Sequence, residues 1–241
     1  MDRRIYLSMS GAKATMQRQD VLAHNLANVS TNGFREELQS FRAVPVRGDG
    51  ASTRAFALET TTGYNPEPGN VIATGRSLDV AVKGNGWLAV QGLDGTEAYT
   101  RAGALDVNAE GTLVTRSGLT VLGGGGPISI PPNAEVSIAG DGTVSARVPG
   151  GVPAPVGRLK LVTAEAPLKR GEDGLFRGPA GELDADPAAQ VQDSALESSN
   201  VSAVSTMVAM IAAARQFEAQ MKSMQTAEKD EQQAQQLLSL N

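Results

Sequence analysis

The sequence predicts an α + all-β protein, in which helices at both ends of the chain flank an antiparallel β-rich middle domain. Three distributions support this prediction. All 12 prolines lie between Pro45 and Pro187, and every one of the 27 glycines except Gly11 lies between Gly33 and Gly181. All seven methionines lie outside that region. Because proline and glycine interrupt helices and favour turns, the two ends are compatible with helix and the middle is rich in turns.

The N-terminal helix is expected to carry a stripe in which positions recur in alternating steps of four and three, as in a heptad seam. The stripe positions are Ile5, Met9, Ala12, Met16, Gln19, Ala23 and Leu26. Asp2 is a suitable N-cap. The helix is expected to end within residues 28–33, because Asn and Gly tolerate the left-handed backbone that terminates helices. Phe34 is then expected to fold back as an apolar anchor.

The middle of the chain predicts short strands separated by turns. "LDVAV" (78–82) alternates in the manner of a strand, and Asp94-Gly95 is a strong hairpin signal. Further strand-like segments follow at intervals of about 8–14 residues, which is typical of an antiparallel all-β domain. The four glycines of 123–126 precede a proline and a strand, so they indicate a turn and not a phosphate-binding loop. Gly48-Asp49-Gly50 and Gly140-Asp141-Gly142 are likewise interpreted as turns.

The C-terminal end repeats the spacing of the first helix. Its stripe positions are Ala203, Met207, Met210, Ala214, Phe217, Met221 and Met224. Val204, Val208 and Ile211 widen this apolar face. Asn200 is expected to be the N-cap. A single helix from Asn200 to Leu238 would be roughly 55–60 Å long at about 1.5 Å per residue.

Composition excludes several classes of function. The net charge of −5 and the pI near 5.0 argue against a nucleic-acid-binding protein. With no cysteine, the chain has neither disulfides nor Cys-type zinc sites. No segment reaches the roughly 18–20 apolar residues that span a bilayer, so membrane insertion is not expected. Residues 1–20 lack the apolar region of a cleavable signal, so export would need another route.

No residues suggest catalysis or cofactor binding. His24 is the only histidine, and it is expected on the polar side of the first helix. One histidine without cysteine or a carboxylate cluster does not make a zinc site. The serine-containing segments have no base near them in the sequence. We therefore expect no enzymatic activity, no catalytic residue, no metal site and no cofactor.

The two stripes predict an interaction surface. They can pair with each other only if both ends of the chain come together, and two helices alone bury little of such stripes. Exposed apolar faces mark partner surfaces, and methionine adapts to neighbours that differ slightly. The predicted assembly interface comprises Ile5, Met9, Ala12, Met16, Ala23, Leu26, Met207, Met210, Ile211, Ala214, Phe217, Met221 and Met224.

The sequence resembles the bacterial flagellar axial proteins of the rod and hook over nearly its whole length. The first motif is "NLANVSTNGF" (25–34), and the second is "SNVSAVSTMVAMIAAARQFEAQ" (199–220). The motif residues are Asn25, Leu26, Ala27, Asn28, Gly33, Phe34, Ser199, Asn200, Val201, Arg215, Phe217 and Glu218. Ala214 departs from the glutamine of many relatives, and Ser202 with Ala203 replaces a common Asp-Pro. Segments such as "FRAVPVRGDG" (41–50) and "EDGLFR" (172–177) are most similar to a proximal-rod member.

The resemblance implies a structural subunit of the flagellar basal body. Residues 1–34 and 196–241 would be terminal helices that pair as a coiled coil in the inner layer of the assembly. Residues 35–70 and 185–195 would connect them to an outer β domain, residues 71–184. Such a subunit would self-assemble with proximal and distal rod proteins into the periplasmic shaft for motility. The flagellar type III export apparatus would export it without signal cleavage.

Two alternatives remain open from the sequence. One is a distal-rod or hook-type protein with the same architecture and another place in the axis. The other is a periplasmic wall-binding or hydrolytic β domain, which would need a cleft with carboxylates or aromatic side chains. With one tryptophan, three tyrosines and five phenylalanines, the chain gives this second alternative weak support.

Overall fold

The computed structural model describes residues 2–45, 55–179 and 181–239, which fall into two compact units. The helical unit contains residues 1–29, 37–63 and 201–241, and the β unit contains residues 30–36 and 64–200. The chain therefore passes between the units four times, after residues 29, 36, 63 and 200. Both ends of the chain lie in the helical unit, as the sequence predicts.

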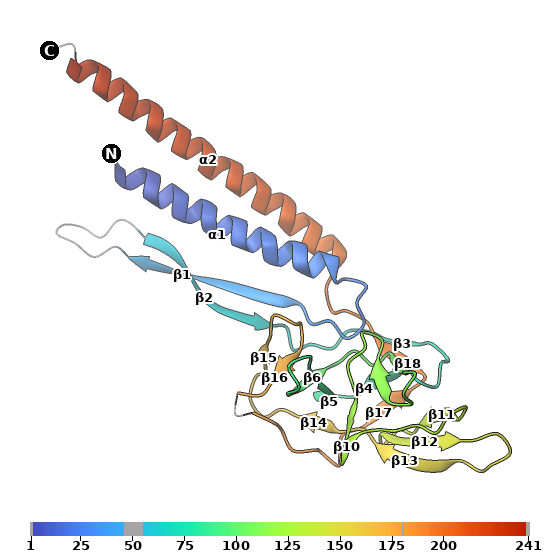
Figure 1. Cartoon of the computed structure of the whole chain (residues 1–241). Helices are drawn as coiled ribbons and strands as arrows, with labels where there is room; N and C mark the ends of the chain where they lie inside the picture. Colours follow the sequence, from blue (N-terminus) through green and yellow to red (C-terminus); the bar gives the residue numbers. More distant parts are fainter. Residues whose placement is uncertain (1, 46–54, 180, 240–241) are drawn as a thin grey trace. The chain divides into compact units, whose positions relative to one another are not determined.

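The helical unit consists of two long helices and a two-stranded sheet. Helix α1 (Asp2–Ala27) and helix α2 (Ala203–Ser239) run antiparallel and side by side, as Figure 1 shows. Strands β1 (Glu37–Pro45) and β2 (Ala55–Tyr64) pair with each other. The sequence predicted both helices, and it did not predict this strand pair, which lies within the expected connecting segment 35–70.

The helix ends are set by local hydrogen bonds. At the end of α1, the side chain of Asn28 donates through Nδ2 to the carbonyl oxygen of His24 at 2.9 Å. At the start of α2, the amide of Ser205 donates to Oγ of Ser202 at 3.4 Å. Ser202 is therefore the N-cap of α2, and the prediction that Asn200 fills this position is wrong. Asp2 is the first helical residue, and its side chain lies outside the described residues.

The β unit is a set of small antiparallel sheets, which confirms the predicted β-rich middle. The strands in chain order are β3 (Val71–Ala73), β4 (Val80–Val82), β5 (Gly86–Gln91), β6 (Glu97–Thr100), β7 (Leu105–Val107), β8 (Leu113–Thr115), β9 (Leu122–Gly123), β10 (Gly126–Pro127), β11 (Glu135–Ile138), β12 (Thr143–Arg147), β13 (Ala154–Arg158), β14 (Leu161–Thr163), β15 (Lys169–Arg170), β16 (Phe176–Arg177), β17 (Val191–Asp193) and β18 (Ala195–Glu197). The largest sheet has the order β14-β5-β6-β16-β15, and a three-stranded sheet has the order β11-β12-β13. The remaining strands pair as β10-β9, β17-β4, β18-β3 and β7-β8.

Strand β5 is buried on both faces and divides the core of the β unit. Leu88 and Val90 point into a large aliphatic cluster, while Trp87 points into a smaller aromatic cluster. The ring of Trp87 lies 5.8 Å from that of Tyr64 and 4.6 Å from that of Phe176. Trp87, the only tryptophan, therefore reports on the packing of the β unit.

The predicted turns that fall within the described residues are confirmed. Asp94-Gly95 joins β5 to β6, and Oδ1 of Asp94 accepts hydrogen bonds from the amide and hydroxyl of Thr96. Gly140-Asp141-Gly142 joins β11 to β12, and the glycine run 123–126 joins β9 to β10. Gly48-Asp49-Gly50 lies outside the described residues.

Gly33 occupies a position where no other residue fits. Its φ angle is 70°, and its amide donates to the carbonyl oxygen of Glu197 at 2.8 Å. A Cβ atom at this position would overlap the carbonyl group of Arg101. The glycine of the first motif thus allows the segment after α1 to lie directly on the backbone of the β unit. The next residue, Phe34, is buried, as predicted for an apolar anchor.

Gly33→Ala should therefore destabilise the β unit by about 2–5 kcal/mol, through left-handed strain together with steric overlap. Gly75→Ala is the matched control, because Gly75 has a φ of 74° and no atom within 4 Å of the place that a methyl group would take. Gly75→Ala should lower the free energy of unfolding only by the left-handed strain, about 1–2 kcal/mol. Urea unfolding followed by Trp87 fluorescence measures both. Equal losses for the two variants would contradict the close-approach explanation.

Candidate assembly interface

The fully buried residues between α1 and α2 have small side chains. Ala12 and Thr15 of α1 are buried, as are Thr206 and Ala213 of α2. Gly11 is the one glycine outside the middle of the chain, and it faces the side chain of Gln220. A Cβ atom added to Gly11 would lie only 3.1 Å from the amide group of Gln220. A glycine inside a helix costs about 1 kcal/mol relative to alanine, so close approach is a physical reason for its presence here.

Polar groups also take part in this contact. Oγ of Ser8 donates to Oγ of Ser223 at 3.3 Å. Three residues further along α1, Gly11 faces Gln220, three residues back along α2, as antiparallel pairing requires. A contact of small and polar side chains buries little apolar area. The two helices therefore pair closely in space while several of their large apolar side chains stay uncovered.

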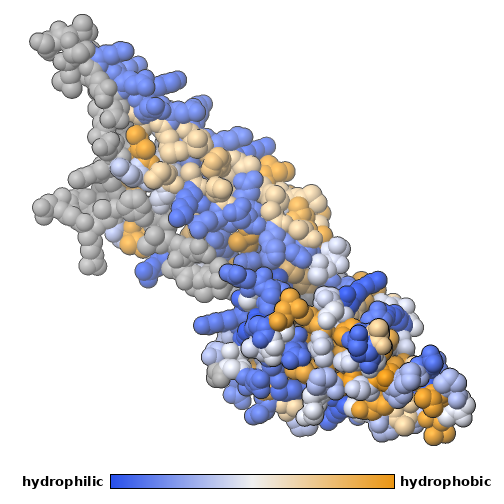
Figure 2. Space-filling model, viewed as in Figure 1, coloured by the Kyte–Doolittle hydropathy of each residue, from blue (hydrophilic) through white to orange (hydrophobic). Residues whose placement is uncertain are grey.

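Several large apolar side chains of both helices are exposed on the monomer. On α1, Met9 is 53% and Met16 is 58% exposed, and on α2, Ile211 is 55% exposed. We call this set the outer stripe; its members are Tyr6, Met9 and Met16 of α1 and Val204, Met207, Val208, Ile211 and Met221 of α2. Figure 2 shows apolar surface running along the helices between polar patches. An exposed apolar surface of this kind is typical of a binding surface.

The predicted assembly interface is divided between two environments. Among its members, Ala12 is buried, and Ile5, Leu26, Met210, Ala214, Phe217 and Met224 are half-buried. The exposed members are Met9, Met16, Ala23, Met207, Ile211 and Met221. Helical spacing places Phe217 on the same face of α2 as Met210 and Ala213, which is the face with the buried residues.

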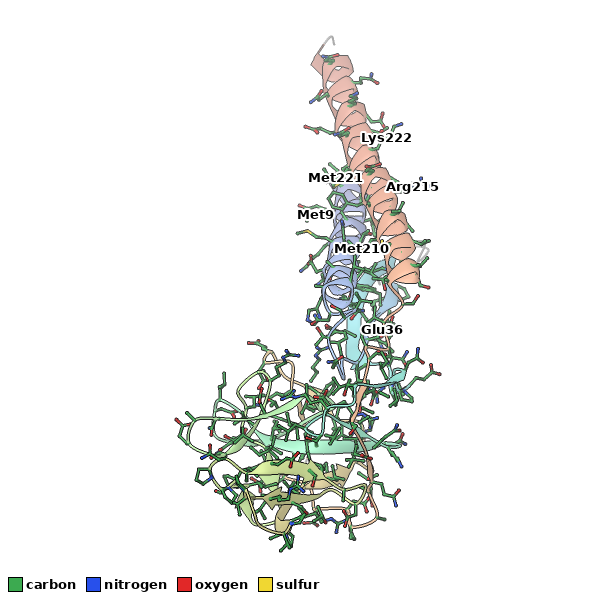
Figure 3. All side chains as sticks on the ribbon, turned by 90° about the vertical axis from the view of Figure 1, so that its right-hand side faces the viewer. Met9, Glu36, Met210, Arg215, Met221 and Lys222 are labelled. Carbon is green, nitrogen blue, oxygen red and sulfur yellow. The ribbon has the colours of Figure 1, made fainter. Side chains whose placement is uncertain are left out.

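The outer side of α2 changes character along its length. Its first turns expose Val204, Met207 and Ile211, whereas Arg215 and Lys222 occupy the continuation of this face. In Figure 3, Met9 and Met221 lie on one side of the helix pair, and Arg215 and Lys222 lie on the other. Of the motif residues in this helix, Arg215 and Glu218 are exposed and Phe217 is half-buried.

The asparagines of the first motif hold the segment that follows α1. Asn25 is buried, and its side chain forms hydrogen bonds to both backbone groups of Glu37, each at 2.9 Å. The side-chain amide of Asn25 thus pairs with the backbone N–H and C=O of Glu37, the first residue of β1, as the backbone of a neighbouring strand would. His24 lies on the exposed side of α1, as predicted, and its Nδ1 forms a 3.0 Å hydrogen bond with the Glu37 carboxylate.

The β unit contains buried charges that no pattern in the sequence indicates. Glu197 is 1% exposed and lies between two buried arginines. Its carboxylate accepts hydrogen bonds from Nε and Nη2 of Arg101 at 2.8 and 2.5 Å, and it is 3.0 Å from Nη2 of Arg35. Arg101 also donates to the carbonyl oxygens of Val82 and Gly84, each at 2.9 Å. Burial lowers the pKa of the Arg35 guanidinium, and the Glu197 carboxylate acts in the opposite direction.

Among the described residues, no three His, Cys, Asp or Glu side chains form a group that could hold a metal ion. None of the helices, over the same residues, combines the length and apolar character required to cross a membrane. The features that stand out are therefore the outer stripe and the contacts of the two motifs.

Three family models match separate parts of the chain. Residues 5–35 match the model described as "Flagella basal body rod protein" and residues 192–237 match "Flagellar basal body rod FlgEFG protein C-terminal". Residues 81–146 match "Flagellar hook protein FlgE/F/G D1 domain". These matches include both terminal helices and the β unit, and they define the class: a protein of the flagellar rod and hook type.

Full-length relatives narrow this class. The chain is 47% identical to the flagellar basal-body rod protein FlgF of Escherichia coli (strain K12), and all of both chains is covered. It has the same identity and coverage with FlgF of Salmonella typhimurium. It is 32% identical to the flagellar basal-body rod protein FlgG of Agrobacterium fabrum, with 94% of this chain and 95% of the relative covered. The chain belongs to the flagellar basal-body rod protein family, and the predicted resemblance to a rod protein like FlgF is confirmed.

The buried carboxylate gives a direct test of the β unit. Glu197→Gln should lower the free energy of unfolding by about 3–5 kcal/mol, because it leaves two buried guanidinium groups without a counter-charge. Glu135→Gln is the control, because Glu135 pairs with Arg147 at the surface. Its loss should lower the free energy of unfolding by only about 0–1 kcal/mol. Urea unfolding monitored at Trp87 distinguishes them. A Glu197→Gln protein as stable as the control would show that the buried charges do not depend on this carboxylate.

Proposed function

We propose that the protein is a structural subunit of the bacterial flagellar basal-body rod, in its proximal part. It polymerises through its terminal helices into the shaft that transmits torque from the motor to the hook. The observation that carries this proposal is the outer stripe, which the helix pair leaves uncovered. The relation to FlgF proteins over the full chain supports the same conclusion.

Each subunit of the rod would contact different surfaces of its neighbours. Subunits that repeat by rotation and rise make heterologous contacts and generate helical tubes. The methionines of the outer stripe suit such contacts, because an unbranched thioether side chain adapts to neighbours in slightly different positions. Fully burying each large apolar side chain contributes roughly 1.5–3 kcal/mol, and the contribution recurs in every subunit.

The predicted interface residues divide between two tasks in this proposal. Ala12 and the half-buried residues of the predicted interface hold α1 against α2 within one subunit. The exposed residues of the predicted interface, together with Tyr6, Val204 and Val208, contact the neighbouring subunits. Residues 1–34 and 196–241 then form the inner coiled-coil layer, residues 71–184 the outer β layer, and residues 35–70 and 185–195 the connections.

The proposal also names location and partners. The subunit works in the periplasmic part of the basal body, beside other proximal and distal rod proteins and further copies of itself. The flagellar type III export apparatus delivers it without signal cleavage. The role is structural and requires no catalytic residue, metal or cofactor.

A distal-rod or hook-type position is the alternative that shares these contacts. The match of residues 81–146 to a flagellar hook protein model supports keeping it. Immunogold labelling of isolated basal bodies distinguishes the two positions, because label at the base of the rod supports the proximal position and label beyond it supports the alternative. No observation on the described residues favours the wall-binding alternative.

Deletion of the gene tests the function itself. Cells without the protein should be non-motile, and their basal bodies should lack a complete rod. Expression of the wild-type chain should restore both. Complete rods in the deletion strain would overturn the proposal.

Two substitutions on opposite faces of α2 separate assembly from folding. Ile211→Asp places a charge on the outer stripe, so the purified monomer should keep its helix content while rods fail to assemble. Ala213→Asp places the charge at the buried contact with α1, so helix content itself should fall, because an unpaired charge in an apolar contact costs several kcal/mol. Circular dichroism and soft-agar motility measure the two effects. Normal swimming by the Ile211→Asp strain would exclude this face as an assembly surface.

A further inference from the structure

Three short segments of the β unit lead directly to the helical unit. They are residues 30–36, residues 64–69 and residues 195–200, and the four passages of the chain begin or end in them. We call them the exit segments. They are far apart in the sequence, yet hydrogen bonds within the β unit join all three.

Asn200 joins the exit segments to one another. Its Oδ1 accepts the amide hydrogen of Glu36 at 2.6 Å. Its Nδ2 donates to the carbonyl oxygens of Asn65 and Glu67 at 3.2 and 2.8 Å, and its own amide donates to the carbonyl oxygen of Phe34 at 3.3 Å. One side chain therefore contacts both of the other exit segments, while Ser202 performs the capping of α2.

The first two exit segments are also joined directly. The amide of Asn65 donates to the carbonyl oxygen of Glu36 at 2.8 Å, and Nδ2 of Asn65 donates to the Glu36 carboxylate at 3.2 Å. Arg35 donates to the carbonyl oxygen of Glu67. Together with the contacts of Asn200, these hydrogen bonds connect each exit segment to the other two.

Glu197 attaches the same group to the core. It belongs to the third exit segment, pairs with Arg35 of the first, and accepts the amide hydrogen of Gly69 of the second at 3.1 Å. Through Arg101 it reaches the carbonyl oxygens at the end of β4 and in the turn after it. The exit segments are thus tied to one another by Asn200 and to the β core by Glu197.

We propose that Asn200 is the positioning residue of a load-sharing clamp that holds the three exit segments together. The proposal rests on the proposed function, since a torque-transmitting subunit must carry load along every passage between its two units. Separate segments would be pulled from the β unit one at a time. Segments joined side by side share the load, so several hydrogen bonds must break together before any one segment is released.

Hydrogen exchange on the purified full chain tests the clamp. In Asn200→Ala, the amides of Glu36 and Asn65 should exchange at least about tenfold faster, because their exit segments lose the bonds that hold them closed. Amides in β5 and β6 should keep their protection. Asn108→Ala is the matched control: Asn108 also accepts a backbone amide, from Thr112 at 2.7 Å, at a turn away from the exit segments.

Asn200→Asp separates the two arms of the side chain. It keeps the acceptor for the amide of Glu36 and loses the donor to Asn65 and Glu67. The Glu36 amide should therefore remain protected while residues 64–69 exchange faster. Unchanged exchange in both Asn200 variants would overturn the clamp, and so would a fall in the protection of the entire β unit, since the residue would then belong to the general core.

Motility under load tests the role of the clamp in the cell. Strains with Asn200→Ala should assemble rods and swim in dilute medium, and should lose speed relative to Asn108→Ala strains as polymer raises the viscosity. Equal speeds at every viscosity would overturn load sharing. Failure of the wild-type chain to restore motility to a deletion strain would instead overturn the proposed function, so the two outcomes are distinguishable.

Discussion

The buried pairing of Glu197 with Arg35 and Arg101 is the interaction on which the arrangement of the β unit depends. A β unit inserted between two terminal helices must bring the segment that follows α1 and the segment that precedes α2 to the same place. Glu197 and Arg35 lie in those two segments, and Arg101 attaches them to the carbonyl groups of the core. Since an unpaired charge in this position would be strongly destabilising, the two segments cannot separate without a large cost.

The helical unit follows a different physical rule. The fully buried residues of its internal contact are Ala12, Thr15, Thr206 and Ala213, with Gly11 against Gln220, while Met9, Met16 and Ile211 are exposed. A monomer optimised for its own stability would bury these large apolar side chains as well. Their exposure fits a subunit whose apolar residues are covered by neighbours in an assembly.

The fold was predictable to the extent that local pattern determines it. Heptad spacing and the separation of glycine and proline from methionine predicted the two helices, and Asp94-Gly95 predicted a hairpin. The pattern did not reveal which face of each helix meets the other helix, because steps of four and three describe two adjacent stripes equally well. Thr206 and Met207 are neighbours in the sequence, yet Thr206 is buried and Met207 is exposed. Asn200 was misassigned as a cap, since its partners at Glu36, Asn65 and Glu67 are distant in sequence.

The motif residues acquire physical roles once these long-range partners are known. Asn25 replaces a neighbouring strand at Glu37, and Gly33 provides the only backbone that fits against Arg101. Both act where the chain changes from one unit to the other, and neither belongs to the outer stripe. The conditions for folding and the conditions for assembly are therefore met by different residues. A subunit of this kind can vary its outer surface without altering how its own two units are built.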